Sequence, residues 1–242
     1  MTAFDHSIII EAMSAVAENP DLQHRAAVFA ALGEPSRLAI IETLTLTDCS
    51  PSELEDRLGI PSNLLAHHLD TLESAGLVLR LRSEGDGRRR YVRLAPDLPD
   101  GLVRTARVEA ANILFVCRHN AARSQFAAAY WNRHSTIPAE SAGTQPAAHV
   151  HPLAVQAAGM RGLDLSGQVP RGYDPLHGAP GLVVSVCDLA FEHAVLFPNA
   201  RHLHWSVPDP ASRSDLKVFE DAFDEIAHRI DRLGPCVVAT QS

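Results

Sequence analysis

The sequence predicts two domains: a mainly helical N-terminal domain that ends in a β-hairpin, and a C-terminal α/β domain with a parallel sheet. The first hundred residues carry capped apolar stripes of helical period and then a segment of alternating apolar and polar residues. Beyond about residue 111, short apolar strands alternate with helices. We place the domains at 1–95 and 111–242, joined by a linker at 96–110 that begins with two prolines and a glycine.

Composition narrows the class of protein. Of 242 residues, 46% are hydrophobic and 21% charged, as is usual for a soluble globular chain. The start, MTAFDHSIIIEAM, has an acidic residue where a signal peptide needs basic ones, and no apolar run reaches membrane-spanning length. We therefore expect a cytoplasmic protein without a membrane partner.

The cysteines are few and widely spaced, with no CxxC pair. In a reducing compartment this argues against a disulfide framework or a structural zinc site and leaves reactive thiols as the alternative. We expect no metal site. The cysteines are Cys49, Cys117, Cys187 and Cys236.

The N-terminal helices are predicted in order. Apolar residues of helical period run from Val28 to Leu44, with Pro35 at a helix start. Ser50 and Glu53 form a capping box for the next helix, which Gly59 ends. The following helix opens at Pro61 and Ser62 and closes at Gly76. Two helices joined by a glycine-containing turn predict a helix-turn-helix.

The hairpin that follows carries a local positive charge. LVLRLRSEGDGRRRYVRL alternates apolar and polar residues around the turn GDG. From Arg80 to Arg93 the sequence has six arginines and two acidic residues, Glu84 and Asp86. The segment therefore has a local charge of +4 in a chain of net charge −8. Such a patch can hold a phosphate backbone, so we interpret this hairpin, the wing, as a DNA contact.

Residues 20–95 as a whole resemble the ArsR/SmtB family of winged-helix repressors. The resemblance rests on EPSRLAIIETL, SELEDRLGIPSNLLAHHLDTLESAGLV and the wing, in that order. It implies a homodimer that reads two half-sites of operator DNA. The major groove would be faced by Ser62, Asn63, His67 and His68, and the phosphates would be held by Arg88, Arg89 and Arg90. The alternative is that these histidines and arginines are merely solvated.

One departure concerns the arsenite sensors of that family, which carry a CxC pair on the first helix of the motif. Here that helix has the sequence SELEDRL, and Cys49 stands alone upstream. A single thiolate cannot make the trigonal site that arsenite prefers, so we interpret Cys49 as a packed residue.

The C-terminal domain is predicted from its strand and helix patterns. We expect strands at Ile113–Cys117, Leu182–Val186 and Leu203–Val207. Helices are expected at Arg123–Arg133, at Pro152–Met160 and in the last amphipathic segment, from Leu216 to Leu233.

The stretch FVCRHNAARSQF contains a cysteine and an arginine in the pattern C-x5-R. That spacing alone is weak, because it arises by chance in roughly one such chain in three. Its context strengthens it, since Cys117 ends an apolar strand and a helix begins at about Arg123 after a short loop. Loop amides and a helix N-terminus would then converge on one spot and form an oxyanion cradle. These donors and Arg123 favour a thiolate at Cys117, and Arg123 can clamp an oxyanion bidentately.

This stretch resembles the phosphate loop of low-molecular-weight protein-tyrosine phosphatases and of the arsenate reductases that share their fold. The similarity covers about residues 111–235 and includes SAGT, the pair His151–Pro152, LDLSG and HWSVPDPA. It implies that Asp209 is the general acid and Cys117 the nucleophile, with Arg123 as catalytic clamp. The oxyanion would be bound by Arg118, His119, Asn120, Ala121, Ala122, Arg123 and Ser124.

Three features favour the reductase branch. The loop HNAARSQ is closer to reductase loops, Ala211 and Ser212 replace the aromatic residues that follow Asp-Pro in phosphatases, and Cys187 ends the strand VVSVC where the reductases have a second thiol. We therefore expect arsenate or phosphate as ligand and no bound cofactor, with an external thiol reductant of the thioredoxin, mycothiol or glutathione type. A tyrosine phosphatase and a non-catalytic oxyanion sensor remain alternatives. Whether Cys187 pairs with Cys117 or a small thiol takes the arsenic stays open.

Overall fold

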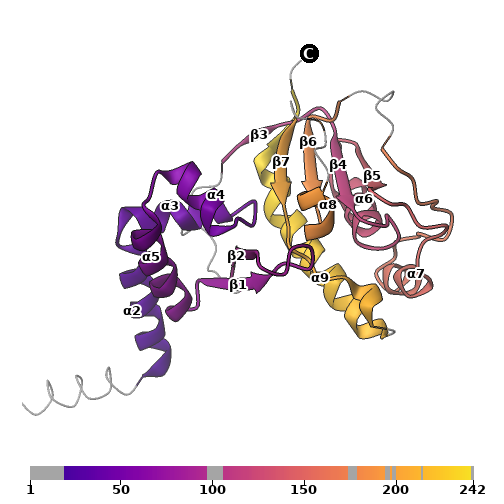
Figure 1. Cartoon of the computed structure of the whole chain (residues 1–242). Coiled ribbons are helices and arrows are strands. Elements are labelled where there is room, and N and C mark those ends of the chain that lie inside the picture. Colours follow the sequence, from indigo (N-terminus) through magenta and orange to yellow (C-terminus); the bar gives the residue numbers. More distant parts are fainter. Residues whose placement is uncertain are drawn as a thin grey trace, which may run out of the picture.

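The computed structural model describes residues 19–96, 106–173, 179–193, 197, 200–213 and 215–240. It has a helical N-terminal part and an α/β C-terminal part, as Figure 1 shows. The N-terminal elements are α2 (Pro20–Leu32), α3 (Pro35–Leu44), α4 (Pro51–Leu58), α5 (Ser62–Ser74), β1 (Val78–Arg82) and β2 (Arg90–Leu94).

The local signals of the helix-turn-helix form the expected structure. Ser50 and Glu53 make the reciprocal capping box at the start of α4. Gly59 ends this helix with φ 65°, in the left-handed region that glycine adopts without strain. Strands β1 and β2 pair antiparallel from Val78↔Leu94 to Arg82↔Arg90, which confirms the predicted hairpin.

The C-terminal part is built on a four-stranded parallel sheet of order β5-β4-β6-β7. Its two inner strands, β4 and β6, are buried along their whole length, as expected for parallel strands covered on both faces. The strands are β4 (Ile113–Cys117), β5 (Ala139–Gly143), β6 (Leu182–Ser185) and β7 (Arg201–His204). The helices are α6 (Arg123–His134), α7 (Pro152–Gly159), α8 (Asp188–His193) and α9 (Leu216–Leu233), with short 3-10 turns η2 (Pro210–Ser212) and η3 (Gly234–Cys236).

Two predictions differ from the structure by more than one residue. Strand β7 is Arg201–His204 rather than Leu203–Val207, because its register with β6 runs from Leu182↔Arg201 to Ser185↔His204 and the chain then leaves the sheet. Residues 97–105 of the predicted linker lie outside the described residues. The end of that linker forms β3 (Val108–Glu109), which pairs in parallel with β8 (Val237–Val238).

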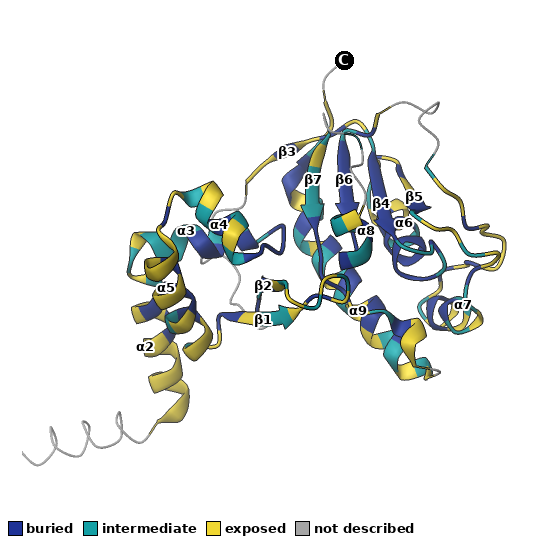
Figure 2. Cartoon of the chain, viewed as in Figure 1, coloured by how far each residue is buried: buried dark blue, intermediate teal, exposed yellow. Residues whose placement is uncertain are grey.

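Each part has its own buried cluster of apolar side chains, although Leu46 of the N-terminal part belongs to the C-terminal cluster. Figure 2 shows buried residues in both parts. Hydrogen bonds and an ion pair also join the two parts. Trp205 Nε1 donates to the Leu46 carbonyl at 2.9 Å, and the Ser206 amide donates to Asp48 Oδ2 at 2.7 Å. Asp48 Oδ1 also pairs with Arg229 at 2.8 Å, with side chains only 1% and 13% exposed. The two parts are therefore in direct, hydrogen-bonded contact.

Within the described residues, no helix combines the length and the apolar character that crossing a membrane requires.

Candidate active site

Cys117 lies at the carboxyl end of β4, where the chain turns into the loop that precedes α6. Its Sγ lies 3.1 Å from Ser124 Oγ and accepts the Asn120 amide at 3.2 Å. Asn120 has φ 49°, a left-handed conformation that asparagine tolerates better than most residues. Its side chain donates to Ser124 Oγ at 2.8 Å and accepts from Gln125 and from the Arg171 amide. Backbone and side-chain donors thus converge on one sulfur.

The loop is shaped from outside by the segment 144–151. The carbonyls of Cys117, Arg118, His119 and Ala121 each accept an amide from that segment, at 2.8–3.1 Å. With its carbonyls bound on the outer side, the loop can turn its amides inward toward an anion. Gly143, of the SAGT motif, allows this close approach, because a Cβ there would lie 2.9 Å from the Arg118 carbonyl oxygen.

Arg123 is the buried cation of the site, with 3% of its side chain exposed. Its Nη2 lies 3.2 Å from Asp209 Oδ2, and its Nη1 donates to the Val207 carbonyl at 2.8 Å. Burial lowers the pKa of Arg123, but the neighbouring Cys187, Cys117, Asp209 and Glu84 outweigh it, so the net pKa is raised. The guanidinium is therefore charged, and the titratable groups around it are all ones that can carry a negative charge.

Cys187 follows strand β6, the neighbour of β4. The Val186 amide donates to the Val116 carbonyl at 2.7 Å, which aligns the ends of the two strands and so the segments that carry the two thiols. Cys187 is 1% exposed, and its sulfur accepts the Ala190 amide at 3.3 Å. Burial raises the pKa of this thiol, Arg123 opposes that effect, and Cys117 adds to it.

A cleft of about 430 Å³ opens above Cys117 and Arg123. Its remaining lining is His119, Ala121, Ala122, Ala147, His149, His151, Pro152, Asp209 and Ala211. The structure thus brings the predicted nucleophile, clamp and general acid to one cleft.

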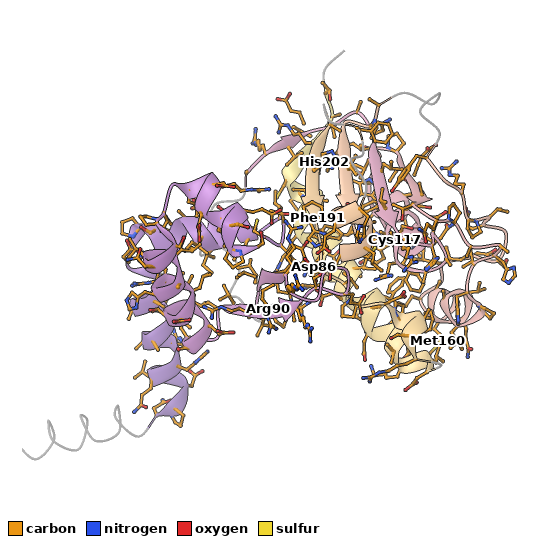
Figure 3. The ribbon with its side chains drawn as sticks, viewed as in Figure 1. Asp86, Arg90, Cys117, Met160, Phe191 and His202 are labelled. Carbon is orange, nitrogen blue, oxygen red and sulfur yellow. The ribbon has the colours of Figure 1, made fainter. Side chains whose placement is uncertain are left out.

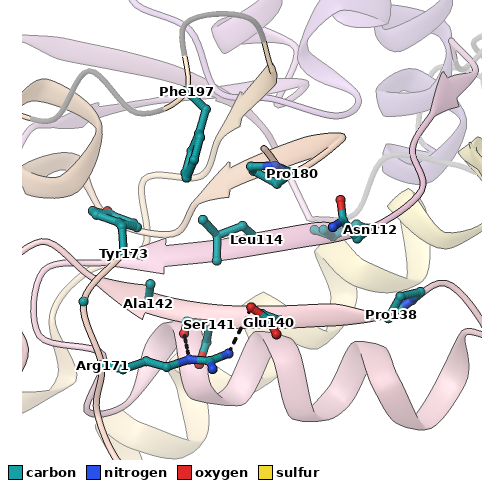
Figure 4. Close-up of a pocket in the computed structure, with 12 residues that line it drawn as sticks. Asn112, Leu114, Pro138, Glu140, Ser141, Ala142, Arg171, Tyr173, Pro180 and Phe197 are labelled. Atoms are coloured by element: carbon teal, nitrogen blue, oxygen red, sulfur yellow. Dashed lines mark hydrogen bonds and ion pairs between the residues drawn. The ribbon is translucent and has the colours of Figure 1, made fainter. Parts of the chain in front are cut away.

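A larger cavity of about 610 Å³ lies along β4 and β5 (Figure 4). There Arg171 pairs with Glu140 at 3.2 Å and donates to the Ser141 carbonyl at 3.1 Å. This cavity is lined by neither thiol and by neither Arg123 nor Asp209. The smaller cleft is therefore the candidate active site, because it alone of the two combines a nucleophile with a buried cation.

Four residues near the site were not assigned to it from the sequence. Glu84, from the wing, lies 3.5 Å from Arg123. Asp188 and His204 form a buried pair at 3.1 Å, behind Cys187. Tyr173 lies near both thiols, and its pKa is raised by burial and by Cys117 and Cys187. Asp188 could have been suspected from the sequence, because it directly follows Cys187. The other three residues come close to the site only through the tertiary structure.

The predicted DNA-contact residues divide into two sets. Ser62, Asn63 and His67 are exposed on α5, and Arg88 and Arg90 are exposed on the wing, while Arg89 is half-buried. His68 is 5% exposed and its Nδ1 lies 3.7 Å from Glu34. The prediction that His68 faces a DNA groove is therefore wrong for this conformation, because the side chain points into the helical core.

The remaining cysteines are packed. Cys49 is fully buried and bridges Val92 through its backbone, and burial raises its pKa to about 12. Cys236 is buried, and its thiol donates to the Arg232 carbonyl at 3.2 Å. In the described parts of the chain, no cluster of three or more His, Cys, Asp or Glu side chains is arranged to hold a metal ion.

A strand, a loop with a cysteine and an arginine at its two ends, and a helix form this candidate site on a parallel α/β fold. Residues 112–240 match the family model of the low molecular weight phosphotyrosine protein phosphatases, and the chain belongs to that family. Residues 24–80 match a helix-turn-helix domain model. The protein is therefore a helix-turn-helix regulator fused to a phosphatase-fold domain.

Individual relatives cover one part or the other. An uncharacterised HTH-type transcriptional regulator of Bacillus subtilis (strain 168), YceK, is 38% identical over 79 residues, which are 32% of this chain and 76% of YceK. An arsenate reductase from Archaeoglobus fulgidus DSM 4304 is 30% identical, covers 50% of this chain and 97% of its own, and has a TM-score of 0.44. The YwlE arginine phosphatase from Geobacillus stearothermophilus is 23% identical over 52% of this chain and 91% of its own, with a TM-score of 0.45.

Proposed function

We propose that the C-terminal domain reduces arsenate with thiols and that the N-terminal domain binds operator DNA, so that the protein is a regulator in arsenic resistance. One observation carries the reductase assignment: Cys187 directly follows β6, and the Val186 amide donates to the Val116 carbonyl at 2.7 Å, so Cys187 lies at the same end of the sheet as Cys117. A phosphatase needs a single nucleophile, whereas reduction of arsenate takes two electrons from two sulfurs.

In the first step, the Cys117 thiolate attacks arsenate held by the loop amides and by Arg123. A sulfur–arsenic bond forms and an oxygen leaves as water, protonated by Asp209. The position of Asp209, 3.2 Å from Arg123, supports this role because acid and clamp then face the same tetrahedral ligand. Ser124 is placed to donate a hydrogen bond to the thiolate.

In the second step, a thiolate attacks the Cys117 sulfur. A disulfide forms, the sulfur–arsenic bond breaks, and its electron pair stays on arsenic, which leaves as arsenite. Cys187 is the candidate thiol inside the protein, and an external thioredoxin-type or small thiol then reduces the disulfide. If a small thiol such as mycothiol or glutathione attacks instead, Cys187 is not needed.

The cleft offers little for a phosphotyrosine ring. Among the described residues that line it, none is Phe, Tyr or Trp, and Ala211 follows the Asp209–Pro210 pair. Stacking of a substrate ring on an aromatic side chain is therefore unavailable from this lining. The cleft fits a small oxyanion better than an aryl phosphate.

The reductase assignment is tested by measuring arsenite release from arsenate with thioredoxin or with small thiols, in parallel with hydrolysis of p-nitrophenyl phosphate. We expect arsenite release in the wild type and none in Cys117→Ser, with Cys236→Ser as the matched cysteine control that keeps activity. Loss in Cys187→Ser with thioredoxin assigns the second thiol. Rapid phosphate hydrolysis without arsenite release would instead assign a phosphatase, and oxyanion binding without either activity would assign a sensor.

For the N-terminal domain, we propose operator binding by a homodimer in the cytoplasm. The exposure of Ser62, Asn63 and His67 on α5 supports a groove contact, with Arg88, Arg89 and Arg90 on the phosphates. Exposed Leu22 and Phe29 on α2, 38% and 58% exposed, support burial of this helix in a dimer.

A further inference from the structure

The tip of the wing lies against the candidate active site. Glu84 Oε2 lies 3.5 Å from Arg123 Nη1, and both of its carboxylate oxygens accept the Asp209 amide, at 2.9 and 3.0 Å. A side chain of the DNA-binding domain thus contacts both the clamp and the loop that carries the general acid.

A second set of contacts holds the wing in this place. The Glu84 amide donates to Asp188 Oδ2 at 2.8 Å, and the Asp86 amide donates to Glu192 Oε2 at 2.6 Å. Ser83 Oγ and Tyr91 OH both donate to Glu192 Oε1, at 2.7 and 2.9 Å. In Figure 3 the labelled Asp86 lies where the wing reaches the C-terminal domain, below Phe191 of α8. The wing is therefore docked by several hydrogen bonds rather than resting on one.

The docked wing gives Arg123 one acidic partner, Glu84, in addition to two partners from the C-terminal domain. Its Nη1 faces Glu84 and Val207, and its Nη2 faces Asp209. Arsenate or phosphate carries up to two negative charges at neutral pH and would enter beside the Glu84 carboxylate. The Glu84 carboxylate and the oxyanion repel each other at this distance, so they compete for the buried Arg123 guanidinium.

We propose that Glu84 is an internal ligand of the oxyanion cradle, so that oxyanion binding and wing docking exclude each other. This inference rests on the proposed oxyanion site, and it adds the regulation of that site by the DNA-binding domain. Because the wing carries Arg88, Arg89 and Arg90, its release changes the surface that the domain offers to DNA phosphates. By linkage, an element that lowers oxyanion affinity is itself displaced by the oxyanion.

The first test is a calorimetric titration of the full chain with inorganic phosphate. Glu84→Gln removes the competing charge and keeps the side-chain size, and we expect phosphate to bind about tenfold more tightly, within the usual range of coupling. Asp86→Asn is the matched control: it removes a charge from the same turn, and its side-chain oxygen can still accept the Arg88 amide. We expect this control to bind phosphate like the wild type.

The second test follows the wing itself by hydrogen exchange of the backbone amides. With saturating phosphate, the Glu84 and Asp86 amides should lose protection in the wild type, and Arg123→Ala should show no such response. Glu192→Gln, which loosens the wing without touching the cradle, should also tighten phosphate binding.

Equal phosphate affinity in wild type and Glu84→Gln, with wing protection unchanged by phosphate, would overturn the coupling and leave the proposed reductase intact. Absence of phosphate binding in both proteins would instead count against the cradle, and with it the proposed function and this inference together. Tighter binding in Asp86→Asn equal to that in Glu84→Gln would also overturn the inference, since net charge alone would then explain it.

Discussion

At the scale of residues, the site depends on two thiols in different surroundings. Cys117 is contacted by Ser124 Oγ and the Asn120 amide. Cys187 accepts the Ala190 amide and does not line the cleft that Cys117 lines, and burial raises its pKa. The two sulfurs are thus suited to successive roles, with Cys187 reacting second.

This difference predicts a pH dependence for the second step. A thiol with a raised pKa is mostly protonated at pH 7, and its reactive thiolate fraction grows with pH up to that pKa. We expect the rate of disulfide formation after arsenate addition to rise between pH 7 and 9, by up to about tenfold per pH unit. Single-turnover quenched-flow measurement of arsenite release checks this. A rate independent of pH over that range would contradict Cys187 as the attacking thiol.

At the scale of elements, the oxyanion loop is a product of its neighbours as much as of its own sequence. Its carbonyls are bound by residues 144–151, and Gly143 lets β5 approach the loop. The chain after β7 supplies Val207 and Asp209 to Arg123. The loop geometry therefore depends on contacts from two other segments.

We predict that Gly143→Ala weakens oxyanion binding about ten- to a hundredfold, because the added Cβ would meet backbone atoms of Arg118 and Asn120 at 2.9–3.0 Å and displace the loop. Gly159→Ala is the matched control, since a Cβ there meets nothing within 4 Å. Calorimetric titration with phosphate measures the effect. Equal phosphate affinity in the two variants would contradict the prediction, because the loop would then accommodate the added Cβ at position 143.

Sequence reasoning succeeded where the signal was local and failed where it depended on packing. The caps of α4, the β1–β2 hairpin and the strand, loop and helix around Cys117 follow from short patterns. The burial of His68 does not, because apolar period cannot tell which polar residue of a helix faces a neighbour. The contact of Glu84 with Arg123 joins two domains, and no short pattern encodes it.

At the scale of the whole molecule, the domains are joined by buried ion pairs as well as by the chain. Asp48 pairs with Arg229, which also pairs with Glu225, and Glu225 pairs with Arg93. Burial lowers the pKa of Arg229, but Asp48 and Glu225 outweigh it and raise the net value. The interface is therefore a charged network whose members depend on one another.

We predict that Asp48→Ala destabilises the protein by about 3–5 kcal/mol, because it leaves Arg229 buried with one partner fewer. The exposed pair Lys217–Asp221, 66% and 61% exposed, provides the control. Asp221→Ala should lower the free energy of unfolding by about 0–1 kcal/mol. Denaturant unfolding monitored by tryptophan fluorescence measures both, since Trp205 lies at the interface. If both variants lost a similarly small amount of unfolding free energy, the Asp48–Arg229 pair would not stabilise the contact between the domains.

Reduction of arsenate by Cys117 and Cys187 alone can be measured in a single turnover without external reductant. The full chain is mixed with arsenate, released arsenite is quantified, and the protein is digested under conditions that preserve disulfides for mass spectrometry. We predict a peptide pair linked through Cys117 and Cys187, in equal amount to arsenite. Arsenite without this link, or arsenate left unconsumed with both thiols free, would contradict the proposed reduction by these two cysteines.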